Sequence, residues 1–338
     1  MVAYLTRRIA LAFLVMVGVS IIVFLLARVI PSDPVGRWVG IRAKAEQRER
    51  ARIELGLDKP LYIQYLSYMN GFVHGNWGTS LYTHQPVLRD IATYLPASLD
   101  LIIFGMATAL ILGIPLGILS AVKNGTIIDH ASRVFSLAGI ALPTFWLAMV
   151  FQLVFFRQLH ILPLSGRVSM LTAILNPINH ITGSNLLDSL VTGNFAALGS
   201  ALSHIILPGI TLAAAPLGLM ARMSRATMLE VLGEDYIRTA RAYGISEIRV
   251  LIVYALRNAI APVLTVGALL FAESLVSTFL VESVFTWPGL GFYASNAILT
   301  VDYPAIMGVT ILISFTYIFL NLIVDITQAF LDPRIRIS

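Results

Sequence analysis

Residues 230–262 read EVLGEDYIRTARAYGISEIRVLIVYALRNAIAP, the most polar stretch in the second half of the chain, and they lie between two long apolar runs. Apolar residues recur at spacings of three and four in the first part. This predicts a helix over 229–243, whose apolar face is formed by Leu229, Leu232, Tyr236, Ala240 and Tyr243. Gly244 ends that helix as a C′ glycine does, and Ser246 can N-cap a second helix carrying Ile248, Leu251 and Ala255. The pattern indicates a docking platform, and an ordinary solvated loop is the alternative.

The opposite face of the predicted first helix is charged. Glu234 and Arg238 are spaced i,i+4 in the favourable order, an arrangement that stabilises a helix by about 0.2–0.5 kcal/mol. Glu230 and Arg241 lie on the same face. The helix is therefore expected to be amphipathic.

The composition is that of a polytopic membrane protein. Apolar residues make up 57% of the chain and charged residues 12%, whereas soluble domains have roughly 45–50% and 25%. Without cysteine the chain has no disulfide and no thiolate chemistry. The six histidines show no metal-ligand spacing, so no metal site is expected.

The apolar runs predict six transmembrane helices in an all-α fold. A run of 22 residues covers roughly 33 Å as a helix, enough to cross a bilayer. The first run follows Arg7 and Arg8 but is too long for a signal peptide, so a retained helix is expected. The predicted spans are Ile9–Ile30, Leu101–Val122, Val134–Phe156, Ile205–Ala221, Ala259–Phe285 and Ala305–Phe330.

Lys and Arg in the short loops predict the orientation. With the N-terminus inside, the cytoplasmic segments hold twelve of these cations, whereas the outside loop 157–204 holds Arg157 and Arg167 and the loop 286–304 holds none. Both termini and the platform are therefore expected in the cytoplasm. The net charge of +5 mostly reflects this topology, and nucleic-acid binding is not expected.

Two long segments are expected outside. Residues 31–96 contain a charged helical stretch and then an aromatic-rich one, with Tyr62, Tyr65 and Tyr68 placed to lie at the membrane interface or in a small packed subdomain. Residues 157–204 are rich in Gly, Pro, Asn and Ser, which predicts an irregular folded loop. Its tip, NPINHITGSN (176–185), is polar and uncharged and is expected to be mobile.

The chain contains no energy-converting motif. G-x-x-x-x-G-K-[ST] is absent, so the chain does not bind ATP phosphates through a P-loop. G-x-S-x-G is also absent, and the spans lack the paired catalytic residues that an intramembrane protease needs. Active transport would therefore draw its energy from a partner.

A stand-alone ion-coupled carrier is the remaining alternative, because such carriers use acidic residues within the membrane. Glu273, Glu282 and Asp325 are the candidates, and Glu273 is the most central. Glu273 can line a translocation path, or it can be a buried, hydrogen-bonded structural carboxyl.

Several motifs together resemble one family. GEDYIRTARAYG (233–244) with ALRNAIAPVLT (255–265) is similar to the EAA loop of ABC-importer permeases, in the dipeptide/oligopeptide branch. Arg238-Thr239-Ala240 stands where the general motif has Glu-Ala-Ala, and the usual Leu-Pro is missing. The likeness covers nearly the whole chain and includes ELGLDKP (54–60), GNWGTS (75–80), TWPGLG (286–291) and DPRIR (332–336).

This resemblance implies a type I importer permease in a bacterial inner membrane, with an N-terminal helix (1–30), an extracytoplasmic segment (31–96), a five-helix core (97–330) and a cytoplasmic tail (331–338). The core would carry the extracytoplasmic loop 157–204 and a cytoplasmic coupling loop over 222–258. It also implies as partners a second, similar permease, two cytoplasmic ATPases that bind ATP-Mg, and an extracytoplasmic solute-binding protein. The chain itself would be a transport subunit without cofactor or catalytic residues. The solute would be a di- or oligopeptide, with nickel chelates, glutathione and haem as alternatives. The residues implied in ATPase coupling are Tyr236, Arg238, Thr239, Ala240, Arg241, Tyr243 and Gly244.

Overall fold

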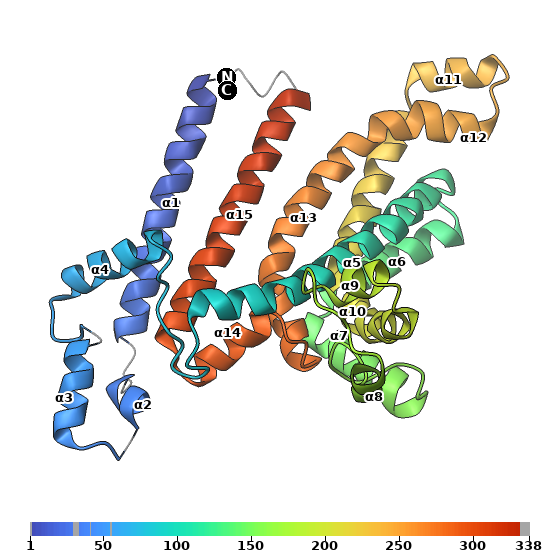
Figure 1. Cartoon of the computed structure of the whole chain (residues 1–338). Coiled ribbons are helices and arrows are strands. Elements are labelled where there is room, and N and C mark those ends of the chain that lie inside the picture. Colours follow the sequence, from blue (N-terminus) through green and yellow to red (C-terminus); the bar gives the residue numbers. More distant parts are fainter. Residues whose placement is uncertain (1, 30–33, 41, 55, 332–338) are drawn as a thin grey trace.

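The computed structural model describes residues 2–29, 34–40, 42–54 and 56–331, and over these ranges the chain is a bundle of helices (Figure 1). The first helices are α1 (Val2–Val29), α2 (Pro34–Val39), α3 (Ala45–Glu54), α4 (Leu61–Val73), α5 (Val87–Val122), α6 (Ile127–Ala141), α7 (Thr144–Phe151) and the π-helix η1 (Gln152–Gln158). They are followed by α8 (Met170–Leu175), α9 (Asn185–Val191), α10 (Phe195–Leu232), α11 (Asp235–Ala242), α12 (Glu247–Arg249), the π-helix η2 (Val250–Leu256), α13 (Arg257–Val284), α14 (Leu290–Leu299) and α15 (Tyr303–Leu331). An all-α fold is confirmed.

Five helical runs are long and apolar enough to cross a membrane: α1, α5, α10, the run from α12 through α13, and α15. With 36 and 38 residues, α5 and α10 are roughly 54 and 57 Å long, well beyond the roughly 30 Å of a hydrocarbon core. They therefore begin earlier, and α10 also ends later, than the predicted spans. The boundary drawn between residues 96 and 97 lies inside α5.

The third predicted span is not one helix. α6 and the α7–η1 helix meet at an angle of 106° across a short break. Pro143 causes this break, because it lacks an amide hydrogen and forces Leu142 out of helical geometry, to φ −77° and ψ 130°. The predicted span Val134–Phe156 therefore corresponds to a sharply bent pair of helices, which makes a sixth span if the pair is counted as one.

The core lies between α5 and α10, which pack along much of their length. Gly105, Gly113 and Gly117 of α5 face α10 at close range, and a Cβ atom at Gly113 would lie only 2.9 Å from the carbonyl oxygen of Leu217. Small residues at such spacing let membrane helices approach closely. The resulting contact places the far end of α5 beside the end of α10 from which the polar stretch emerges.

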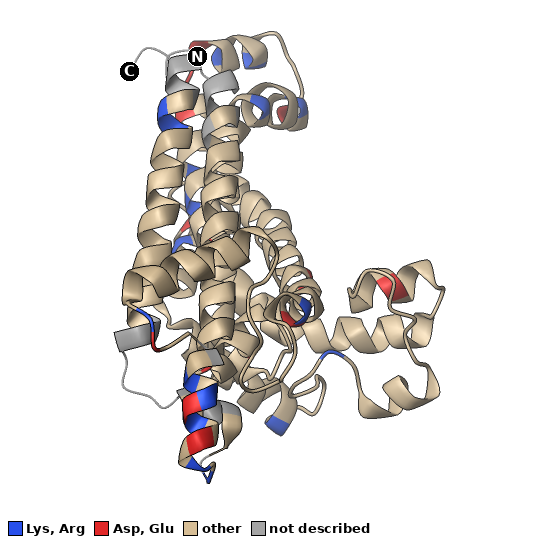
Figure 2. Cartoon of the chain, turned by 60° about the vertical axis from the view of Figure 1, so that its left-hand side comes forward, with Lys and Arg blue, Asp and Glu red and all other residues tan. Residues whose placement is uncertain are grey.

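The start of α1, the end of α15 and the short helices α11 and α12 lie at one end of the bundle (Figure 1). In Figure 2 many of the charged residues lie near this end and on α3 toward the other, and fewer lie along the helices between them. Within residues 42–96, α4 packs against α1, where the rings of Phe24 and Tyr65 are 5.4 Å apart and Ser20 Oγ is 2.8 Å from the Tyr65 hydroxyl. Tyr62 remains exposed, so the aromatic segment is packed on one side only.

Candidate functional site

Residues 229–243 are divided between the end of α10 and α11, instead of forming the single first helix that was predicted. α10 ends at Leu232, where Gly233 N–H bonds to the Glu230 carbonyl, and α11 begins at Asp235. Glu234 separates them in an extended conformation, with φ −70° and ψ 147°. The prediction of one helix over 229–243 was therefore wrong. We use "platform" for residues 233–256, which comprise α11, α12, η2 and their connections.

The break also changes which side chains of α11 are buried. Ile237 is fully buried and Ala240 is 5% exposed, whereas Tyr236 and Tyr243 are 40% and 82% exposed. The predicted apolar face was thus correct for Ala240 and wrong for the two tyrosines, because the break rotates α11 relative to the periodicity of α10. Ile237 and Ala240 pack in one apolar cluster with Ala121, Met228, Val250, Ala255 and Ala259.

The predicted C′ glycine is confirmed. Gly244 has a φ of +73°, and its N–H bonds to the Arg241 carbonyl at 2.9 Å. The next N–H, of Ile245, bonds to the Ala240 carbonyl at 3.3 Å. These two bonds form a Schellman motif, which turns the chain back toward the bundle. Ser246 occupies the N-cap position of α12, but its side chain makes no capping hydrogen bond.

The outer face of the platform carries exposed, paired charges. Arg241 donates to both carboxylate oxygens of Glu247, at 2.6 and 3.2 Å, and this hydrogen bonding raises the pKa of Arg241. Arg238 pairs with Asp235 at 3.3 Å rather than with Glu234, since Glu234 lies outside the helix. Tyr243, Arg238, Thr239 and Ile248 are exposed beside these pairs. This face therefore offers mixed aromatic and charged surface to solvent or to a partner.

The acidic candidates in the spans have different surroundings. Glu273 is exposed on the surface of α13, and its carboxylate has no hydrogen-bond partner among the described residues. Glu282 is fully buried, accepts from Ser98 at 2.6 Å and from the Phe292 N–H at 3.0 Å, and lies against Gly289 of the TWPGLG motif. Glu282 is thus a structural carboxyl that fixes the turn into α14. The side chain of Asp325 lies outside the described residues.

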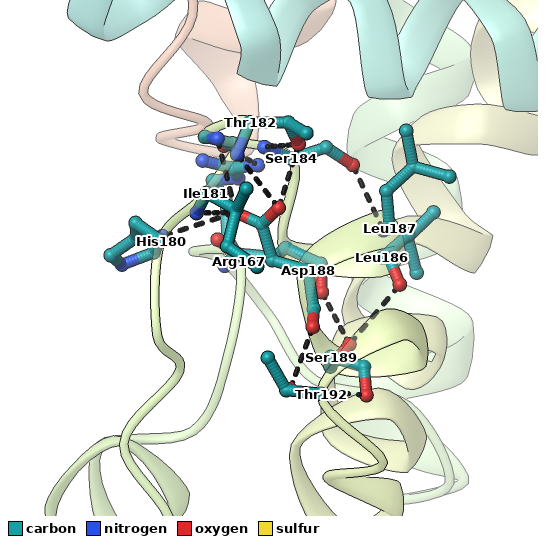
Figure 3. A network of polar contacts seen from close by, with 12 residues as sticks. Arg167, His180, Ile181, Thr182, Ser184, Leu186, Leu187, Asp188, Ser189 and Thr192 are labelled. Atoms are coloured by element: carbon teal, nitrogen blue, oxygen red, sulfur yellow. Dashed lines mark hydrogen bonds and ion pairs between the residues drawn. The ribbon is translucent and has the colours of Figure 1, made fainter.

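A buried polar network holds residues 167–192 against α5, and nothing in the sequence pattern predicted it (Figure 3). Arg167 pairs with Asp100 of α5 at 2.6 Å, and Ser184 donates to the same carboxylate. Asp188 accepts hydrogen bonds from the backbone N–H groups of residues 181–183 and from the Thr182 hydroxyl. Burial would raise the pKa of Asp188, but these hydrogen bonds outweigh burial and lower it. Residues 181–184 of the polar tip are therefore anchored.

A second unpredicted network joins α6 to α10. Asp129, which is 1% exposed on its side chain, accepts from Arg225 at 2.7 and 2.9 Å and from Ser120 at 2.6 Å. Asp129 lies in the first turn of α6, ahead of the predicted span Val134–Phe156, and its partners are 9 and 96 positions away. Within the described residues, no group of three His, Asp or Glu side chains could hold a metal ion.

Comparison with known proteins identifies the family. Residues 113–337 match the binding-protein-dependent transport system inner membrane component family, and residues 1–102 match the N-terminal region of that class of membrane component. The chain belongs to this family. It is thus a transport component of the inner membrane and not an enzyme, and it is hereafter called the permease.

Individual relatives align with the permease over almost its full length. It is 44% identical to the probable D,D-dipeptide transport system permease protein DdpB of Escherichia coli, over 95% of the chain and 94% of the relative. It is 40% identical to the dipeptide transport system permease protein DppB of the same species, over 99% of both. It is 34% identical to the oligopeptide transport system permease protein AppB of Bacillus subtilis, over 99% of the chain and 100% of the relative.

Proposed function

We propose that this permease is the membrane subunit of an ATP-driven importer for di- or oligopeptides. The observation that carries the proposal is the full-length similarity to relatives named for dipeptide and oligopeptide transport. These names favour peptides over nickel chelates, glutathione or haem as the solute. A second permease completes the pore, two ATPases bind ATP-Mg, and an extracytoplasmic protein delivers the solute. This proposal takes the place of the stand-alone ion-coupled carrier, the alternative that the acidic residues within the spans had suggested.

The platform is the proposed docking site for an ATPase. Its inner face packs on the permease itself, so the outer face with Tyr236, Arg238, Thr239, Arg241 and Tyr243 is free to meet a partner. Ala240 and Gly244 contribute indirectly, by holding α11 on the bundle and by turning the chain. The platform connects the end of α10 to the start of α13, so movement of an attached ATPase would pass directly into two spans.

Co-purification of the assembled transporter tests the docking site. Tyr243→Asp should reduce the amount of ATPase recovered with the permease and should lower uptake of a labelled dipeptide, because it places a charge in the centre of the contact. Tyr62→Asp changes a 67% exposed tyrosine on α4, compared with 82% for Tyr243, and is the matched control. Equal recovery of ATPase with both variants and wild type would assign docking to another surface.

Glu273 is proposed to line the translocation path. Its exposed carboxylate lies near the middle of α13, where contact with lipid would cost several kcal/mol, so a polar path or the second permease is the favourable environment. Glu273→Gln should lower peptide uptake with normal recovery of the whole complex. Unchanged uptake kinetics would leave Glu273 without a role in translocation.

The proposed topology has both termini and the platform in the cytoplasm. The permease has no native cysteine, so single introduced cysteines report accessibility without background. Gly233→Cys should react with an impermeant thiol reagent only in opened cells, whereas Met170→Cys, at an 82% exposed position, should react in intact cells. Labelling of position 233 in intact cells would reverse the orientation.

A further inference from the structure

A cavity of about 160 Å³ opens between α5, α6 and α10, close beneath the platform. On this measure one water needs roughly 10–15 Å³, so the cavity has room for a group much larger than a water molecule. Its lining combines small residues with cationic and hydroxyl side chains. The lining residues are Leu116, Gly117, Ser120, Ser132, Arg133, Ser136, Leu137, Ala221, Arg222, Arg225 and Ala226.

The cavity is positively charged. Arg133, Arg222 and Arg225 line it, and the Asp129 carboxylate pairs with Arg225 and, at longer range, with Arg133, which gives a formal sum of +2. Both oxygens of Asp129 are already taken, since Arg225, Ser120 and the Gly125 N–H all donate to them. Arg133 approaches Asp129 only to 3.6 Å. Arg133 also donates to Nδ1 of His130 at 2.6 Å, which leaves its charge in place, so two positive charges remain in excess for an anion.

Two hydroxyl donors add to this site. Ser132 and Ser136 lie one turn apart on α6, are 7% and 6% exposed, and line the cavity. No hydrogen bond between described residues uses either hydroxyl, although many other helical serines in this chain bond to the carbonyl four residues earlier. Neither oxygen is among the fully buried unpaired atoms of the described residues, so both hydroxyls are open to a bound group. Guanidinium groups flanked by hydroxyl donors match the oxygens of a phosphate group.

The rim of the cavity is apolar. Leu137 lines it and is 54% exposed, and Val134 on the same side of α6 is 68% exposed. A free phosphate ion would gain nothing from this rim, whereas acyl chains would cover it. Basic pockets between membrane helices near the cytoplasmic surface bind anionic lipid headgroups in other proteins.

We propose that this cavity binds the phosphate of an anionic phospholipid, held by Arg133, Arg222, Arg225, Ser132 and Ser136. The lipid would tie α6 to α10 next to the apolar cluster that supports the platform, since Ala121 of that cluster follows the cavity-lining Ser120 and Met228 lies three residues after the cavity-lining Arg225. This lipid site is distinct from the solute path and from the docking face proposed above.

Binding to the purified full-length permease in non-ionic detergent tests the proposal. The probes are dioctanoyl-phosphatidylglycerol, dioctanoyl-phosphatidylcholine and inorganic phosphate, titrated separately by a calorimetric or thermophoretic assay. Phosphatidylglycerol should bind more tightly than phosphatidylcholine, and inorganic phosphate most weakly. Equal affinity for the two lipids would overturn the headgroup assignment, and inorganic phosphate binding as tightly as phosphatidylglycerol would overturn the lipid assignment.

Arg222→Ala localises the site. Arg222 is exposed and has no ion pair within the described residues, so its removal should not disturb folding, which the thermal midpoint checks. The affinity for phosphatidylglycerol should fall roughly tenfold, the usual effect of losing a charge-assisted hydrogen bond. Arg257→Ala removes an exposed arginine at the start of α13, outside the cavity, and is the matched control.

The serines provide a second, independent variant. Ser132→Ala with Ser136→Ala keeps every charge and should weaken phosphatidylglycerol binding by a few-fold at unchanged thermal stability. Wild-type affinity in both the Arg222 variant and the double serine variant, or an equal loss in Arg222→Ala and Arg257→Ala, would refute binding in this cavity.

Discussion

The loop 167–192 and the platform both lie outside the long helices, yet they are attached to the bundle in different ways. The loop is held by buried charge, since the side chains of Arg167 and Asp100 are only 12% and 8% exposed. The platform is held by apolar packing of Ile237 and Ala240, and its ion pairs are on the surface. A buried pair cannot open without exposing an unpaired charge, whereas a surface pair can exchange partners at little cost. The loop is therefore built to stay in place, and the platform can rearrange its charges when a partner docks.

The largest effect is expected from a substitution that breaks the attachment of the loop 167–192 to α5. Arg167→Met keeps the apolar bulk but leaves Asp100 buried without its cation, which should cost about 3–5 kcal/mol of stability. Limited proteolysis should then cut within residues 176–192. Arg241→Met removes a surface pair, 44% and 53% exposed, and should cost no more than about 1 kcal/mol. Similar thermal midpoints for the two variants would remove the distinction between the two regions.

A smaller effect is expected where apolar packing holds the platform. Ala240→Arg forces a long charged side chain into a position that is 5% exposed, and overpacking of this kind costs about 1–3 kcal/mol. α11 should detach locally, so ATPase recovery should fall although the spans insert normally. Membrane-fraction levels and co-purification measure the two effects separately. Full ATPase binding together with full transport would show that the docked surface does not depend on α11.

The smallest effect is expected at the turn. Gly244→Ala meets no atom within 4 Å, so its cost comes from the φ of +73° alone and should be about 1 kcal/mol. A matching small fall in thermal midpoint, with ATPase recovery near wild type, would confirm a purely conformational role. A loss of ATPase binding much larger than the loss of stability would indicate that a partner's backbone approaches this glycine.

The sequence predicted the elements that depend on local composition. Long apolar runs have one stable form in a bilayer, so the order of the spans followed from hydropathy, and the sixth is matched if the helix pair bent at Pro143 is counted as one span. Gly244 was predicted correctly because a Schellman turn depends on a few neighbouring residues and on glycine's access to positive φ. The likeness of separate motifs to a peptide-permease branch agreed with the full-length relatives.

The tertiary structure alone determined which side chains face inward and which charges meet. The period of three and four suggested that Tyr236 and Tyr243 lie on the packed face. The break at Gly233 and Glu234 reset the phase of α11, and this phase depends on how the helix docks on η2 and α10. Asp100 with Arg167 and Asp129 with Arg225 are pairs separated by 67 and 96 positions. No local pattern encodes such pairs, since burial creates them only after the helices have packed.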